Sequence, residues 1–251
     1  MLEFLGLSSA HVDLLNAVTF ELSKVPGVIA AVLGGSYARG IARHDSDLDV
    51  GLYYSENSPP DIEAIRRCAE KISVPNTRPT VVGYYKWGPW VNGGAWIQTP
   101  AGKLDLLYRK IEQVQRVIDE SQQGLYQHDY YQQPTFGFVS VIYLAEIKCC
   151  LPLSDPHHLI QKLKRSVEIY PTVLRQKMIL DCLTIAEFTI FHAHGFADRG
   201  CRLYGERPSV LPRDSISQSS VCPSDAPTGK GSDVHCFPSR LKTTCFPQER
   251  A

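Results

Sequence analysis

The clearest feature of the chain is a pair of apolar runs separated by a short polar stretch. Residues 28–33 are apolar throughout, and a second apolar run, which contains Asp47 and Asp49, ends at Tyr54. Residues 34–36 (Gly-Gly-Ser) follow the first run directly. Short apolar runs bounded by turn residues predict two strands joined by a small-residue turn and a short helix. Because the first strand is apolar on both faces, we expect it to lie inside its sheet.

Helical periodicity appears on both sides of these strands. Between residues 8 and 25, apolar side chains recur at helical spacing, and residues 61–72 repeat the pattern. In later segments, the alternation of apolar and polar residues is weaker. Further strands are expected at 80–85, 95–99 and 103–108, with a hairpin turn at 91–94 and a helix from residue 111.

After residue 133 the pattern changes to helices. Helices are expected at 136–150, 157–170 and 171–195, with a linker at 151–156. We therefore predict an α+β fold: a mixed, twisted sheet with helices on one side, followed by a helical domain and a disordered tail. The predicted divisions are a catalytic domain at 1–133, a helical domain at 134–199 and the tail at 200–251.

The tail loses all periodicity and is rich in proline and serine, a composition typical of disorder. The change is abrupt, which suggests the hypothesis that the gene is frameshifted near residue 200. Such a shift would truncate the helical domain. Sequencing the locus tests it, and an alternate frame that encodes no helical continuation would reject it.

Composition narrows the function classes. The chain carries 26 basic and 26 acidic residues, so its formal net charge is zero, which argues against a dedicated nucleic-acid binder. None of its eight cysteines forms a Cys-x-x-Cys pair, so a zinc site is not expected and reduced thiols in a cytoplasmic protein are favoured. Neither a signal peptide nor a membrane-spanning run is expected.

Two carboxylates on the second strand are the first candidates for chemistry. Asp47 and Asp49 are two residues apart, so both point to one face while Leu48 points into the core. Two carboxylates on one face of a buried strand repel each other unless a cation lies between them. Oxygen ligands of this kind suit Mg²⁺, which also takes phosphate oxygens and water.

The small-residue turn before them suits a phosphate. Gly34 and Gly35 have no side chain to block the approach of a phosphate chain to the backbone, and Ser36 adds a hydroxyl. The N–H groups of the short helix that follows would face that phosphate. Arg39 is either a further phosphate contact or a solvent-facing side chain that orders the loop. Together, turn, hydroxyl and carboxylate pair predict a metal–nucleotide site.

The stretch GGSYARGIARHDSDLDV at residues 34–50 resembles the signature of the nucleotidyltransferase superfamily typified by DNA polymerase beta. It is most similar to the small bacterial-type branch that includes aminoglycoside nucleotidyltransferases and minimal nucleotidyltransferase antitoxins. The resemblance extends over about residues 10–200 and is most specific at residues 34–49. It implies that the sheet is of the nucleotidyltransferase type and that a helical domain closes one side of an acceptor cleft.

The resemblance also implies a third carboxylate on a later strand. Asp105 lies between apolar neighbours in the strand expected at 103–108 and is the best-placed candidate. From the residues alone, a carboxylate in this position indicates either a functional site or an exposed aspartate of an edge strand. Three side chains of the helical half could line the cleft. These are Glu146, Lys148 and Glu187. The tryptophans around residues 87–96 either stack on a ligand or seal an apolar edge.

The reaction implied is transfer of a nucleoside monophosphate from an NTP to an acceptor hydroxyl, with release of pyrophosphate. Asp47 and Asp49 would hold Mg²⁺ on the triphosphate, and residues 34–36 would hold the β- and γ-phosphates. Asp105 would complete a second Mg²⁺ site, accept the proton of the acceptor hydroxyl, or do both. The acceptor is expected to be a small molecule, because a minimal antitoxin normally lacks a helical extension. A protein-modifying antitoxin with a toxin partner is the first alternative. A catalytically weak nucleotide-binding protein from a damaged gene is the second.

Overall fold

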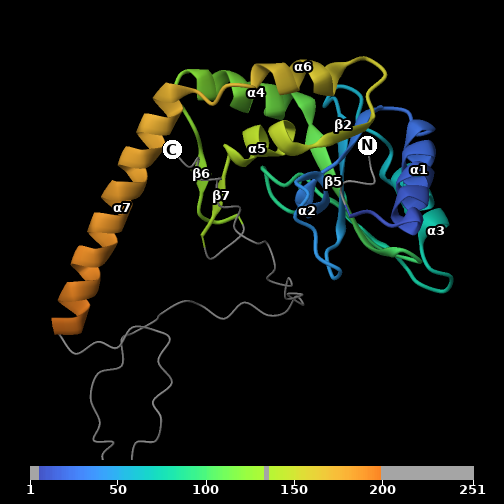
Figure 1. Cartoon of the computed structure of the whole chain (residues 1–251), viewed down its shortest axis with the longest axis horizontal. Helices are drawn as coiled ribbons and strands as arrows, with labels where there is room; N and C mark the ends of the chain where they lie inside the picture. Colours follow the sequence, from blue (N-terminus) through green and yellow to red (C-terminus); the bar gives the residue numbers. More distant parts are fainter. Residues whose placement is uncertain (1–5, 133–135, 199–251) are drawn as a thin grey trace, which may run out of the picture.

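The computed structural model describes residues 6–132 and 136–198. A six-stranded sheet with the strand order β3-β4-β5-β2-β1-β8 lies at its centre (Figure 1). Its strands are β1 (Val28–Leu33), β2 (Leu48–Tyr54), β3 (Thr80–Val81), β4 (Gly94–Thr99), β5 (Gly102–Lys110) and β8 (Leu151–Ser154). The expected α+β class is confirmed. The tail expected at 200–251 lies outside the described residues.

Strand β1 has a neighbour on each side, as its continuous apolar run predicts. It pairs antiparallel with β2, and the two are joined through the short helix α2 (Gly35–Ala38). Strand β2 also pairs with β5, and this is the parallel pair of the sheet. Parallel neighbours need a long crossover connection, which here contains α3, β3 and β4. The crossover returns the chain so that β5 runs beside the strand that carries Asp49.

Helices cover both faces of the sheet, so the expectation of helices on one side is wrong. One core contains Leu15 and Leu22 of α1 and Ile65 of α3. The other contains residues of α4, α5 and α6, among them Val117 and Ile147. The helices are α1 (Ser9–Ser23), α3 (Ile62–Ile72), α4 (Ile111–Gln122), α5 (Ile142–Cys149) and α6 (Leu159–Ser166). Alternate residues of β1 and β2 enter the two cores, as expected of a sheet buried on both faces.

The segment at 151–154, expected to be a linker, is strand β8. It pairs antiparallel with β1 and closes that edge of the sheet. Pro152 lies within it, and a proline is tolerated there because an edge strand needs hydrogen bonds on one side only. A segment that follows residue 133 therefore completes the main sheet.

Two other expectations need correction. The strand expected at 80–85 is only Thr80–Val81, and residues 82–93 form a long connection to β4 in place of a tight hairpin turn. The long helix expected at 136–150 is shortened to α5, because Phe138–Val139 (β7) pairs with His128–Asp129 (β6). Local pairing here overrides the helical pattern of the sequence.

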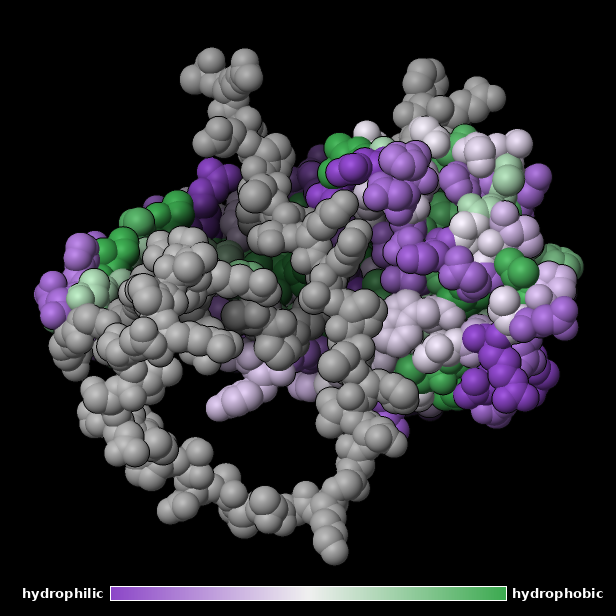
Figure 2. Space-filling view, turned by 90° about the horizontal axis from the view of Figure 1, so that it is seen from below, coloured by the Kyte–Doolittle hydropathy of each residue, from purple (hydrophilic) through white to green (hydrophobic). Residues whose placement is uncertain are grey.

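The last described helix, α7 (Thr172–Asp198), projects from the rest of the protein (Figure 1). Only Leu174 of this helix is buried, whereas Phe188 and Phe191 are exposed. Apolar side chains appear along its surface in Figure 2. No helix in the described part of the chain is both long and apolar enough to cross a bilayer.

Candidate active site

The turn after β1 lies directly against Asp49. The N–H of Gly34 donates to the Asp49 carbonyl oxygen at 2.8 Å. Gly35 has a φ of +60°, and a Cβ at this position would lie 1.7 Å from Oδ2 of Asp49. A side chain would therefore be strained by the backbone and would also displace the carboxylate. Gly35 is required because the turn and the carboxylate occupy adjoining space.

Asp49 and Asp105 are directly opposite each other on the parallel strands β2 and β5. Paired residues in neighbouring strands point to the same face, so the two carboxylates lie side by side. Their chain neighbours Leu48 and Leu104 point to the other face and are fully buried in the core under α1 and α3. Asp47 immediately precedes β2, and its charge is the largest charge effect on Asp49. The structure thus pairs Asp49 with Asp105 and leaves Asp47 near enough for its charge to act on both.

Both paired carboxylates resist ionisation. Burial, followed by the charges of Asp47 and Glu146, raises the pKa of Asp49 from 3.8 to about 6. Burial, followed by the charges of Asp49 and Asp47, raises the pKa of Asp105 from 3.8 to about 7. Burial and the like charges thus outweigh the opposing effects of Arg109 and Arg39 on Asp49 and of Lys103 on Asp105. A cation bound between the two carboxylates would reverse this balance.

The carboxylate oxygens of Asp49 and Asp105 suit a divalent cation. Within residues 6–132 and 136–198, neither Asp49 nor Asp105 accepts a hydrogen bond or forms an ion pair through its carboxylate. Partly buried, unpaired carboxylates of this kind suit Mg²⁺. As the side chains stand, no group of three His, Cys, Asp or Glu residues in the described chain is close enough to enclose an ion. The fit is therefore one of charge and ligand type, with Asp49 and Asp105 at its centre.

The remaining predicted residues lie on or beside α2. No protein hydrogen bond within the described residues uses the hydroxyl of Ser36, which is half-buried. Arg39 is exposed and follows α2 as its C-cap. Its Nε donates to the Gly35 carbonyl oxygen at 3.3 Å, and its charge lowers the pKa of Asp49. Arg39 therefore orders the loop and also brings positive charge toward the carboxylates.

The tryptophans separate into two groups. Trp90 is buried and stacks on Phe138 at 5.6 Å between ring centroids, so it belongs to the core. Trp96 lies on β4 directly opposite Asp105, and its ring is 4.5 Å from that of Trp87. The sequence showed the cluster but not this register, which depends on the pairing of β4 with β5.

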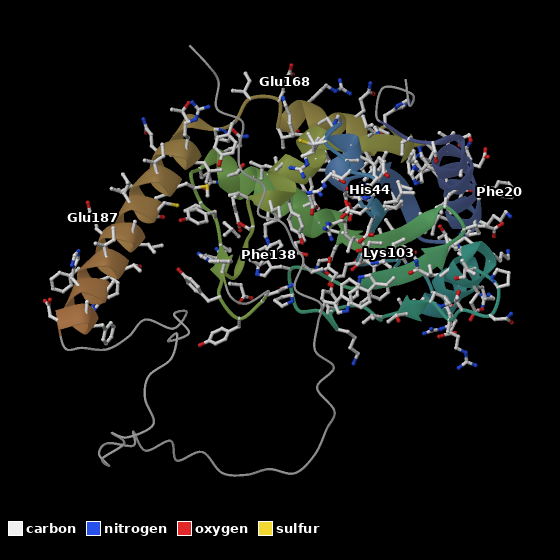
Figure 3. The ribbon with its side chains drawn as sticks, turned by 60° about the horizontal axis from the view of Figure 1, so that its bottom comes forward. Phe20, His44, Lys103, Phe138, Glu168 and Glu187 are labelled. Atoms are coloured by element: carbon white, nitrogen blue, oxygen red, sulfur yellow. The ribbon has the colours of Figure 1, made fainter. Side chains whose placement is uncertain are left out.

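A buried ion pair lies on the same face, farther along the strands. Arg109 of β5 donates from Nε and Nη2 to the two oxygens of Glu146 on α5, each at 2.7 Å. The sequence suggested Glu146 as a cleft residue but gave no partner for it. Lys148 donates to the carbonyl oxygen of Glu168, and Glu187 is exposed on α7, apart from Lys103 of β5 (Figure 3). Glu187 thus lies apart from the strand that carries Asp105, and its place in an acceptor cleft stays a prediction.

Comparison with known proteins agrees with this architecture. Residues 14–89 match the family model described as "Nucleotidyltransferase domain". The matched segment runs from α1 to the loop before β4 and includes the Gly34–Gly35 turn and Asp49, but ends before Asp105. A search of curated proteins found no match. The match supports the superfamily resemblance for this segment, and the branch within the superfamily stays a prediction. Over residues 14–89 the chain is therefore similar to the nucleotidyltransferase domain family, whose members transfer nucleoside monophosphates.

Proposed function

We propose that the protein transfers a nucleoside monophosphate from an NTP to an acceptor hydroxyl in a Mg²⁺-dependent reaction. One observation carries the proposal: the turn at Gly34 and Gly35 lies against Asp49, and Asp49 lies beside Asp105. A phosphate-binding turn and a row of unpaired carboxylates are thus adjoining parts of one surface. If the glycines formed only a tight turn and the aspartates were only a solvated surface pair, the raised pKa values of Asp49 and Asp105 would have no explanation.

The residues have distinct roles in this proposal. Asp47, Asp49 and Asp105 bind Mg²⁺, which when bound neutralises the phosphate charge and polarises the phosphoryl oxygens. The backbone of the turn and the Ser36 hydroxyl hold the β- and γ-phosphates, and Arg39 adds a positive charge at their edge. The carboxylates and the turn together fix the α-phosphate between the acceptor and the leaving group.

The transfer is a single displacement at phosphorus. The acceptor oxygen forms a bond to the α-phosphorus, and the bond between the α-phosphorus and the bridging oxygen breaks. The electron pair of that bond leaves with pyrophosphate. The hydroxyl proton passes to a carboxylate oxygen of Asp105 or to water.

A small-molecule acceptor is favoured over a protein acceptor. Helices α5 to α7 follow the matched segment and extend the chain beyond a minimal nucleotidyltransferase. The superfamily resemblance associates such an extension with small acceptors. The carboxylates Asp47, Asp49 and Asp105 are all present, which favours an enzyme over a remnant of a damaged gene. The four described cysteines are unpaired, which supports a cytoplasmic setting.

Pyrophosphate release tests the proposal. The full chain is incubated with Mg²⁺, each of the four common NTPs and a panel of hydroxyl compounds. Pyrophosphate formation that requires both Mg²⁺ and an acceptor supports the transfer. The variant Asp47→Ala/Asp49→Ala should release no pyrophosphate, and Phe20→Ala, an exposed change on α1, should behave as wild type. Equal release by the wild type and the double aspartate variant would overturn the assignment. Transfer to a co-expressed toxin protein, with none to small molecules, would favour the antitoxin alternative.

A further inference from the structure

Helix α7 meets the rest of the described protein, which we call the body, along its first three turns. The Leu174 side chain is fully buried, and Met178 is partly buried and packs against the core under α4 to α6. The Tyr126 hydroxyl of the body donates to Oδ2 of Asp181 at 2.8 Å. The helix has 27 residues and is about 40 Å long, so more than half of its length extends past these contacts (Figure 1).

Apolar side chains are exposed on more than one face of α7. Eight large ones have exposed fractions of 48–73%: Val173, Ile179, Leu180, Leu183, Ile185, Phe188, Ile190 and Phe191. Leu183 follows Leu174 by nine residues, which is two and a half helical turns, so it points away from the body. Phe188 lies nearly on the Leu174 side and is exposed as well. A helix that is apolar all round is typical of a protein interior, so α7 has the surface of a helix that packs against another segment.

One stripe on the outward side of α7 has the spacing of a contact line between two helices. Its residues are Ile179, Leu183, Ala186, Ile190 and Ala193, at intervals of four, three, four and three. Apolar residues at these alternating intervals form the contact line of paired helices. The two alanines let a second helix come close, and large side chains of that helix fit beside them. We call this stripe the seam.

A second copy of the chain offers a surface that matches the seam. Residues 199–251, which follow α7, are rich in proline and serine and lack apolar residues at helical spacing, so they offer no such stripe. Two identical seams related by a twofold axis form a self-complementary interface. Stable interfaces bury about 800 Å² on each side and use about 20–30 residues. Helix α7 provides a stretch of this length with large apolar side chains along it.

The charges of α7 favour an antiparallel pair. Arg175 and Lys177 lie near its start, where Asp181 offsets one positive charge through its ion pair with Lys177 at 2.6 Å. Glu187 and Asp198 lie in the second half, which has neither lysine nor arginine. In an antiparallel pair, the positive half of one helix faces the negative half of the other. The two bodies then lie at opposite ends of the paired helices and do not compete for space.

We propose that the protein forms a homodimer in which the α7 helices of two copies pack antiparallel along their seams. Each helix then covers the apolar face that the other exposes. The inference goes beyond the proposed function and does not depend on it, because α7 and the strands that carry Asp49 and Asp105 are separate parts of the protein (Figure 1).

The mass of the protein in solution tests the dimer. Light scattering of the full chain during size-exclusion chromatography should give twice the chain mass of 28.0 kDa. Leu183→Glu places a carboxylate in the seam and should raise the dissociation constant of the dimer at least about 100-fold. Ile190→Glu should do the same. Phe20→Glu is the matched control and should stay dimeric, because Phe20 of α1 is 62% exposed and Leu183 is 57% exposed.

Photo-crosslinking tests the antiparallel direction. Benzoylphenylalanine in place of Arg175 should crosslink two copies, and mass spectrometry of the peptides should place the crosslink in the last two turns of α7, at residues 192–198. Urea unfolding curves show that each variant is folded. We expect both glutamate variants to fold, since they replace exposed side chains and glutamate favours helices.

Three results would overturn the inference. The first is a wild-type mass of 28.0 kDa at every concentration, and binding of that monomer to anionic vesicles would assign the seam to a membrane surface instead. The second is that Leu183→Glu and Ile190→Glu remain as dimeric as Phe20→Glu. The third is a crosslink to the first turns of α7, which would mean a parallel pair. Pyrophosphate release tests the proposed function separately, so the two can fail independently.

Discussion

Two charged rows on the same strands and the same face differ in one respect. In the first, Asp49 is paired with Asp105, and no ion pair to either carboxylate is found in the described residues. In the second, Tyr53 is paired with Arg109, whose guanidinium makes two hydrogen bonds to Glu146. Helix α5 covers the second row, which we call the closed row. The first row, Asp49 and Asp105, lies beside the glycine turn, and we call it the open row.

The difference separates a structural charge from a functional one. A buried guanidinium that connects a strand to a helix is stable only with its partner in place. Carboxylates that have no partner cost stability, and their placement is explained if a ligand supplies the missing charge. The comparison therefore predicts opposite consequences for changes in the two rows.

The largest expected effect is on activity in the open row. Asp49→Asn and Asp105→Asn keep the shape of the side chain but remove its charge. Each should lower the rate of pyrophosphate release at least about 10³-fold, because several kcal/mol of metal-mediated stabilisation is lost. Steady-state assays at saturating Mg²⁺ and NTP measure it. Wild-type rates in either variant would contradict the assignment of the row.

The next effect is on stability in the closed row. Glu146→Gln leaves the Arg109 charge buried without a counter-ion and should lower the free energy of unfolding by about 3 kcal/mol. The matched control is Glu63→Gln, which breaks the exposed Arg66–Glu63 pair and should cost less than about 1 kcal/mol. Urea titrations of both variants make the comparison. Equal small losses would show that the Arg109–Glu146 pair is not structural.

Alanine substitutions at two glycines distinguish the effect of backbone strain from the effect of displacing the Asp49 carboxylate. Gly35 and Gly40 have φ values of +60° and +67°, so Ala is strained at either position. A Cβ at Gly35 collides with Asp49, whereas a Cβ at Gly40 meets nothing within 4 Å. Gly35→Ala should therefore lower activity about 10²-fold, because small displacements of catalytic groups have effects of this size. Gly40→Ala should lose stability alone. Similar activities in the two variants would show that the close approach of Gly35 to the Asp49 carboxylate does not matter for activity.

The smallest effect is the pH dependence of stability. The folded-state pKa values of Asp49 and Asp105, about 6 and about 7, lie above the usual 3.8. The native state then binds more protons than the unfolded state between pH 4 and 7, so the free energy of unfolding without metal falls as pH rises through this range. Asp49→Asn should reduce that fall by about 1–2 kcal/mol. Urea titrations in chelator at pH 4.5 and 7.5 measure it, and an unchanged slope in the variant would refute the raised pKa.

Much of the open row could be predicted from the sequence. The strand that carries Asp49 and the turn at Gly34 and Gly35 follow from apolar runs and glycines that are close in the chain. Asp105 was found only through the superfamily resemblance. Its register with Asp49 depends on a parallel pairing between strands separated by a long crossover, which periodicity does not encode.

The closed row and the sheet edge were beyond sequence reasoning. Nothing near Arg109 in the chain indicates Glu146, because the pair joins a strand to a helix that packs on it later. Strand β8 is short and contains Pro152, which removes the usual signals of a strand. Long-range packing decides both features, whereas strands β1 and β2 and the turn between them follow from local signals. The local signal for a hairpin at 91–94 was misleading, because residues 82–93 form a long connection.

Mg²⁺-dependent binding of NTP tests the central claim most directly. Calorimetric titrations compare the wild type with Asp49→Asn/Asp105→Asn, with unfolding curves to show that both proteins are folded. We predict that the wild type binds NTP tightly only with Mg²⁺, and that the double variant binds it at least about 100-fold more weakly, a difference of about 2.7 kcal/mol. Equal Mg²⁺-dependent affinity in the two proteins would contradict the account.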